Sequence, residues 1–149
     1  MRTQSSMLNN ICIKVIVVTV MVGGIFACTP LVTEQATVKA RLQESFTLSV
    51  GEVAEIQDES LRVRLDSVPE DSRCPINALC IWAGNARVRL SLTKGGSQQQ
   101  QVELNTTLEP KIAPYLAYSV QLASLTPLPL AGESPQNRKY QATLAISKR

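Results

Sequence analysis

Polar and apolar side chains alternate in several short runs between residues 44 and 149. In the clearest run, LRVRLDSV, the apolar Leu61, Val63 and Leu65 alternate with charged residues. Successive side chains of a strand point to opposite faces, so this period of two predicts a strand with one buried and one solvated face. The pattern recurs in SFTLSVGEVAEI, IWAGNARVRL, QVELNTTL, YSVQLASL and YQATLAIS, which gives about seven predicted strands.

The same alternation predicts which side chains form the core. We expect these to face inward: Phe46, Leu48, Val50, Val53, Ile56, Leu61, Val63, Leu65, Ala86, Val88, Leu90, Leu92, Tyr118, Val120, Leu122, Tyr140, Ala142, Leu144 and Ile146. Between strands, TKGGSQQQQ carries a Gly-Gly turn signal that is typical of a hairpin. The segment TPLPLAGESPQNRK is rich in Pro and Gly and is expected to be a loop, because proline cannot donate to a ladder.

These strands, without a convincing amphipathic helix, predict an all-β domain. The expected form is an antiparallel two-sheet sandwich of the kind that immunoglobulin-like domains adopt, and a small closed barrel is the alternative. The inter-sheet disulfide of antibody domains is not expected, because Cys74 and Cys80 are too close in sequence to bridge two sheets.

The first 27 residues follow a different pattern. Arg2 and Lys14 lie in a stretch without acidic residues, and VIVVTVMVGGIFA (residues 15–27) follows with Thr19 as its only polar side chain. This run is shorter than the ~20 apolar residues of a spanning helix. It fits the apolar part of a secretory signal, which is ~7–15 residues long. We therefore interpret residues 1–27 as a signal peptide.

The signal ends in IFAC, which resembles the lipobox of bacterial lipoproteins. Ile25, Ala27 and Cys28 fit that pattern, whereas Phe26 departs from the small residue usual at its position. The resemblance implies cleavage before Cys28, a diacylglyceryl thioether on its sulfur and acylation of the new amino terminus. Two or more acyl chains anchor a protein stably. An uncleaved membrane anchor and an ordinary signal peptide are the alternatives.

The lipoprotein resemblance also implies a location and a division of the chain. Thr29 follows the cysteine, in place of the aspartate associated with inner-membrane retention. In a Gram-negative host this favours the outer membrane, with the domain facing the periplasm. The mixed polar segment up to residue 43 then reads as a tether, so we divide the chain into a signal (1–27), a lipidated cysteine with a flexible tether (28–43) and a β domain (44–149).

Charge excludes one class of partner. The chain has fifteen basic and twelve acidic residues and no histidine. Loss of Arg2 and Lys14 with the signal leaves thirteen basic residues against twelve acidic ones, a net charge of +1. A nucleic-acid binder shows a clustered basic stripe, so no nucleic-acid partner is expected.

Cys74 and Cys80 remain as a pair once the signal and the lipidated cysteine are set aside. A structural zinc site needs four ligands, with paired cysteines two to four residues apart, and a redox dithiol usually has the spacing C-x-x-C. CPINALC fits neither pattern. A disulfide needs only a Cα separation of ~4.4–6.8 Å, so we predict a Cys74–Cys80 disulfide and no metal or cofactor.

Residues on either side of the disulfide have predicted structural roles. We expect Trp82 to be a core aromatic packed on the disulfide at the start of a strand, with ligand stacking as the alternative. Gly84 and Asn85 permit a bend or bulge in that strand. Asp71 and Ser72 are expected to orient the loop through hydrogen bonds with nearby backbone amides.

The sequence favours a binding module over an enzyme. It contains no G-x-S-x-G elbow, no histidine to activate a nucleophile and no Gly-rich phosphate loop. The candidate contact surface for an envelope protein is the loop around Arg73, Ile76, Asn77 and Leu79, together with the Pro-rich loop at 126–135. A small-ligand or polysaccharide binder is the alternative function.

The segment EDSRCP, followed after a short gap by C-x-WAGNA-x-V-x-L, resembles a segment of uncharacterised bacterial secreted and lipoprotein domains. The similarity runs from about Phe46 to Ile146, and the cysteine segment is its most specific part. The resemblance implies an envelope location and a β domain, and it implies no enzymatic mechanism.

Overall fold

A computed structural model of the chain describes residues 37–149. The predicted signal peptide, Cys28 and the predicted tether up to residue 36 lie outside the described residues. Within residues 37–149, no helix is long and apolar enough to cross a membrane.

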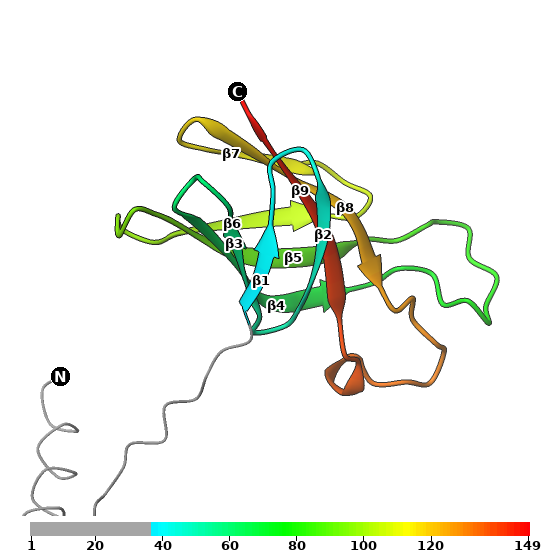
Figure 1. The fold of residues 1–149 in the computed structure, drawn as a ribbon. Coiled ribbons are helices and arrows are strands. Elements are labelled where there is room, and N and C mark those ends of the chain that lie inside the picture. The colour runs from blue at the N-terminus through cyan, green and yellow to red at the C-terminus, as the bar shows by residue number, and fades with distance from the viewer. Residues whose placement is uncertain (1–36) are drawn as a thin grey trace, which may run out of the picture. The chain divides into compact units, whose positions relative to one another are not determined.

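The first sheet has five strands. Their order is β1 (Thr37–Ala40), β3 (Val53–Ile56), β4 (Leu61–Asp71), β5 (Ala86–Lys94) and β6 (Gln100–Asn105). β1 pairs with β3 in parallel, and every other pair in this sheet is antiparallel. The predicted Gly-Gly hairpin is confirmed, since β5 and β6 pair across residues 95–99 (Figure 1).

The second sheet has four antiparallel strands. Their order is β2 (Ser45–Ser49), β9 (Gln141–Lys148), β8 (Tyr118–Thr126) and β7 (Ile112–Tyr115). One 3-10 turn, η2 (Pro135–Asn137), lies in the Pro-rich connection between β8 and β9. The loop predicted for this connection is thereby confirmed.

The two sheets enclose one apolar core, which confirms the predicted sandwich over the barrel. Its largest fully buried side chains include Leu65, Leu90, Leu144 and Ile146, which come from both sheets. Each such side chain contributes roughly 1.5–3 kcal/mol when it leaves water. β3, β4, β5 and β6 pair in succession within one sheet, whereas an immunoglobulin sheet combines strands A, B, E and D, so the strand order differs. The immunoglobulin-like variant of the prediction is not found.

Three predictions about where strands or the domain begin or end need correction. Val50 is half exposed, because β2 ends at Ser49 and the chain turns at Gly51, whose φ is +91°. The domain begins before residue 44, because β1 pairs with β3 and buries Ala40. The strand predicted from residue 81 begins only at Ala86, so the segment before it is free to form a loop.

The long strands β4 and β5 carry the candidate site at their shared end. They pair from Leu61 opposite Lys94 to Asp71 opposite Ala86, with register shifts after Leu65. The chain leaves β4 at Asp71 and returns to β5 through residues 72–85, the green loop of Figure 1. We call residues 72–85 the stapled loop.

Candidate functional site

A disulfide closes the stapled loop. The Cα atoms of Cys74 and Cys80 are 5.9 Å apart, within the range that a disulfide requires, and the predicted bond is confirmed. Closing so short a loop removes little entropy from the unfolded chain, about 2 kcal/mol in the chain-entropy model. The bond fixes the path of the loop beyond the end of the sheet.

Backbone hydrogen bonds close the base of the stapled loop below the disulfide. The Ser72 amide donates to the Asn85 carbonyl at 2.7 Å, and the Cys74 amide donates to the Ala83 carbonyl at 3.0 Å. Gly84 lies between these two rungs with a φ of +69°, and a Cβ placed on it would lie 1.9 Å from the Ser72 carbonyl oxygen. Only glycine fits this approach, so the predicted bend at Gly84 has a definite steric cause.

A buried ionic cluster lies under the loop. The Asp71 carboxylate accepts hydrogen bonds from Arg73 Nε and Nη2, both at 2.8 Å, from Arg138 Nη1 at 3.2 Å and from the Tyr140 hydroxyl at 3.0 Å. The side chain of Asp71 is fully buried, and those of both arginines are nearly so. Breaking such a cluster would leave a buried charge without a partner, which is costly. We call these four residues the Asp71 cluster.

The environment shifts the titration of the cluster's members. Burial disfavours the charged form of Asp71, but the hydrogen bonds and charge of Arg73 outweigh it and hold the pKa of the carboxyl below its ordinary value. Burial raises the pKa of Tyr140 above its ordinary value, and its contact with Asp71 adds to the shift. Asp71 therefore stays ionised at neutral pH and is occupied by donors, which makes it a poor general base.

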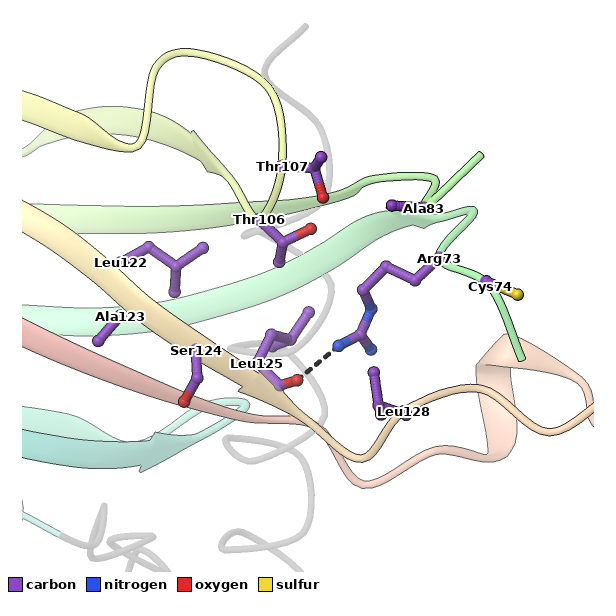
Figure 2. Close-up of a pocket in the computed structure, with 10 residues that line it drawn as sticks. All are labelled: Arg73, Cys74, Ala83, Thr106, Thr107, Leu122, Ala123, Ser124, Leu125 and Leu128. Carbon is purple, nitrogen blue, oxygen red and sulfur yellow. Dashed lines mark hydrogen bonds between the residues drawn. The ribbon is translucent and has the colours of Figure 1, made fainter. Parts of the chain in front are cut away.

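Arg73 also ties the stapled loop to the second sheet. Its Nη1 donates to the carbonyl of Leu125, which is the dashed contact in Figure 2, and its Nη2 donates to the carbonyl of Pro127 at 2.7 Å. Arg73 is only 7% exposed, so the prediction that it contacts a partner is wrong. The prediction that Asp71 orients the loop is confirmed, because its carboxylate also accepts the Arg73 backbone amide at 3.2 Å.

The stapled loop and the Pro-rich loop at 126–135 lie against each other. The Ile76 amide donates to the Pro129 carbonyl at 3.0 Å. The Asn77 side chain accepts the Ala131 amide at 2.8 Å. The two loops that the sequence singled out are therefore joined into one surface at one end of the sandwich (Figure 1).

Large apolar side chains project from this surface. Leu79 is fully exposed, Ile81 is 92% exposed and Ile76 is 65% exposed. Trp82 is 81% exposed, so the prediction that it packs in the core is wrong. The reason is that residues 81–85 run beyond the end of the sheet and have no facing layer. We call the exposed set the apolar end: Ile76, Leu79, Ile81 and Trp82, with Leu128 and Leu130 of the Pro-rich loop.

The apolar end carries no charge. No charged residue occurs in residues 74–86 or in residues 127–132. The exposed surface of a soluble protein normally carries Lys, Arg, Asp and Glu. A contiguous apolar patch without these residues marks a contact site.

A hollow of about 260 Å³ lies beside the stapled loop (Figure 2). Its lining includes the apolar residues Leu122, Leu125 and Leu128 and the polar residues Thr106, Thr107 and Ser124. Pockets for drug-sized ligands are about 300–1,000 Å³. The hollow is thus suited to one inserted side chain more than to a sizeable ligand.

Asn85 holds the rim of the hollow on the β6 side. Its Nδ2 donates to Asn105 Oδ1 at 2.8 Å, and its Oδ1 accepts the Thr107 amide at 3.0 Å. Asn105 is itself buried and donates to the Glu109 carbonyl at 3.1 Å. The stapled loop is therefore fixed on one side by Asn85 and on the other by Arg73.

Sequence reasoning missed Trp82 and Ile81 as parts of the exposed surface, and Arg138 and Tyr140 as partners of Asp71. A usable signal for the first two was their place directly after Cys80, before Gly84, in a segment without charge. Arg138 and Tyr140 lie more than sixty residues from Asp71, so no local pattern links them to it. Among residues 37–149, no group of three acidic or cysteine side chains is placed to hold a metal ion.

Comparison of the chain with protein-family models, with curated proteins and with solved structures finds no match. The resemblance of its amino terminus to lipoprotein signals, and of its cysteine segment to secreted bacterial domains, therefore stays a prediction.

Proposed function

We propose that the protein is a lipid-anchored lipoprotein of the bacterial cell envelope that works as a non-catalytic protein-interaction module. The contact surface is the apolar end. A lipid on Cys28 anchors the chain, in the outer membrane where the host is Gram-negative.

The observation that carries this proposal is the rigid display of uncharged apolar side chains. Ile76, Leu79, Ile81 and Trp82 project from a loop that a disulfide closes and that hydrogen bonds fix on both sides. A loop held in one conformation loses little entropy when it binds, which favours affinity. An exposed Trp is a typical anchor at protein interfaces, and contiguous exposed apolar side chains mark a contact surface.

The anchor is supported by the sequence alone. Residues 15–27 have the length and composition of a signal, and IFAC ends at Cys28. We expect Cys28→Ala to remove lipid labelling and to release the protein from the membrane fraction. Unchanged fractionation of that variant would contradict the lipoprotein assignment.

Small-ligand or polysaccharide binding is the competing function. Sugar and metabolite sites usually offer several exposed aromatic rings, whereas Tyr115, Tyr118, Tyr140 and Phe46 are buried in the sandwich. A saturating ligand at 100 times its Kd would add ~2.7 kcal/mol to stability. A strong thermal shift with a small molecule would therefore favour this alternative.

The interaction function is tested by crosslinking in the intact envelope. The tagged, anchored chain is crosslinked in cells, and the proteins that it captures are identified by mass spectrometry. We expect a discrete partner whose capture falls at least tenfold with Leu79→Ala or Trp82→Ala. Leu116→Ala is the matched control, because Leu116 is 62% exposed in the turn before β8, at the opposite end of that strand.

A second variant separates folding from recognition. Changing both Cys74 and Cys80 to Ser opens the staple, and circular dichroism of that variant shows whether the sandwich remains folded. Capture that survives this change and both apolar substitutions would contradict the proposed surface.

A further inference from the structure

The apolar end carries a projecting side chain directly beside a hollow. Trp82 is 81% exposed, and its neighbour Ala83 lines the hollow wall. Leu128, on the Pro-rich loop, lines the same hollow (Figure 2). One copy of the chain thus presents both a projection and a cavity at the same end of the sandwich.

A surface with this property can bind a copy of itself. In a two-fold dimer the same patch of each subunit faces the other, so a projection of one copy meets the hollow of its mate and the reverse. We infer that the partner of the apolar end is a second copy of this chain, with Trp82 of each copy inserted into the hollow of the other. This inference rests on the proposed function, since it names the partner of the same surface.

The size of the hollow fits this occupant. An apolar cavity of ~150 Å³ holds a benzene molecule, and the hollow has about 260 Å³, which accommodates the larger indole ring of tryptophan. Thr106, Thr107 and Ser124 are among its lining residues, and a hydroxyl oxygen can accept the hydrogen bond that a buried indole N–H requires. The surface of a lipid bilayer offers no discrete side chain that would fill a hollow of this size.

The absence of charge on the apolar end and the surface area that two copies would bury are both consistent with a dimer. Residues 74–86 and 127–132 are uncharged, so two copies meet without like-charge repulsion. A large apolar side chain removes roughly 60–120 Å² from water when it becomes buried. The six members of the apolar end from each of two copies then cover about 700–1,400 Å², which spans the ~1,000 Å² that a specific interface needs.

The test uses the full chain in its membrane. Two copies with different tags are expressed together, and Trp82 is replaced in one of them by the photoreactive amino acid p-benzoylphenylalanine. We expect irradiation to give a product of twice the mass, in which the crosslinked peptide of the second copy contains residues 122–128. The same replacement at Leu116 is the matched control and is expected to give at least tenfold less of this product.

A second measurement does not depend on the photoreactive residue. Copies with different tags are purified together from mild detergent, and Trp82→Ala or Leu128→Glu is expected to lower the recovery of the second tag at least tenfold. Circular dichroism confirms that each variant remains folded. Equal recovery from these variants and from Leu116→Ala would overturn the inference.

The remaining outcomes separate this inference from the proposed function. A crosslink from position 82 to a different protein overturns self-association and leaves the interaction function standing. A crosslink to lipid alone overturns both, because it makes the apolar end a membrane contact. Equal dimer yields from positions 82 and 116 overturn the inference too, since they indicate crowding in the membrane.

Discussion

Two ionic clusters of the same composition lie at opposite ends of the sandwich. At one end Asp71 lies between Arg73, Arg138 and the Tyr140 hydroxyl. At the other end Glu59 lies between Lys148, Lys94 and the Tyr118 hydroxyl. Each cluster has a carboxylate, two cations and a tyrosine, yet only the Asp71 cluster supports a candidate site.

Burial and the type of cation separate the two. The carboxylates differ little, since the side chain of Asp71 is fully buried and that of Glu59 is 13% exposed. The cations differ more, because both arginine side chains are nearly buried whereas those of Lys94 and Lys148 are 34% and 59% exposed. The planar guanidinium of Arg73 bonds a carboxylate and two backbone carbonyls at once, which the point charge of a lysine cannot do with the same rigidity. The Asp71 cluster therefore fixes two loops with buried cations, whereas the cations around Glu59 remain partly in solvent.

The largest expected effect is the loss of the buried carboxylate. Asp71→Asn leaves the buried Arg73 without its anion, whereas Arg138 keeps its ion pair with Glu133. We expect the change to lower the free energy of unfolding by about 3–5 kcal/mol. Glu59→Gln, the matched change at the other end, is expected to cost far less, and its cost should shrink as salt is added. Urea unfolding followed by circular dichroism measures both. Equal losses would contradict the distinction between the clusters.

Gly84 and Gly96 allow the backbone conformation at the two ends of the sandwich to be compared. Gly84→Ala places a Cβ against the Ser72 carbonyl, and we expect it to cost about 2–5 kcal/mol from left-handed strain plus overlap. Gly96 has a φ of +76° in the opposite hairpin with nothing near its missing Cβ. Gly96→Ala should therefore cost only about 1–2 kcal/mol from strain. Urea unfolding compares the two variants. An equal loss in the free energy of unfolding would show that the backbone at the base of the stapled loop shifts to accommodate the Cβ.

Acid should weaken the stapled end through Asp71. Because the folded pKa of this carboxyl lies below its ordinary value of 3.8, its contribution is complete above that pH and is lost as the pH falls through the folded pKa. We expect the stability gap between the natural protein and Asp71→Asn to be constant from pH 7 to pH 5 and to narrow below about pH 4. Urea midpoints between pH 7 and pH 2 measure this gap, and a gap that does not narrow at all between pH 5 and pH 2 would contradict the assignment.

The smallest expected effect is that of Trp82. Because its side chain is exposed, Trp82→Ala should change the free energy of unfolding by no more than about 0.5 kcal/mol at a dilution where copies are apart. Phe46→Ala, in the buried face of β2, should cost about 3–5 kcal/mol. If Trp82→Ala lowered the free energy of unfolding as much as Phe46→Ala, the Trp82 side chain would have to be buried in the core.

Strand positions and the disulfide could be predicted because each depends on local pattern. The alternation holds in β9, in β4 up to Leu65 and in β5 up to Leu90, because successive side chains of a pleated strand point to opposite faces. The pattern failed at Val50 and Trp82. Both residues lie outside a strand, where the alternation of polar and apolar residues does not indicate which side chain is buried.

The sequence by itself determined the all-β class, most of the core, the disulfide and the two loops of the candidate surface. Only the tertiary structure decided that these loops join, that Arg73 is buried and that Trp82 faces outward. The physical reason is the sequence distance: Arg73 meets Pro127 and Asp71 meets Arg138, contacts that arise only when two sheets pack. Periodicity predicts which way a side chain points within an element, and packing decides what it meets there.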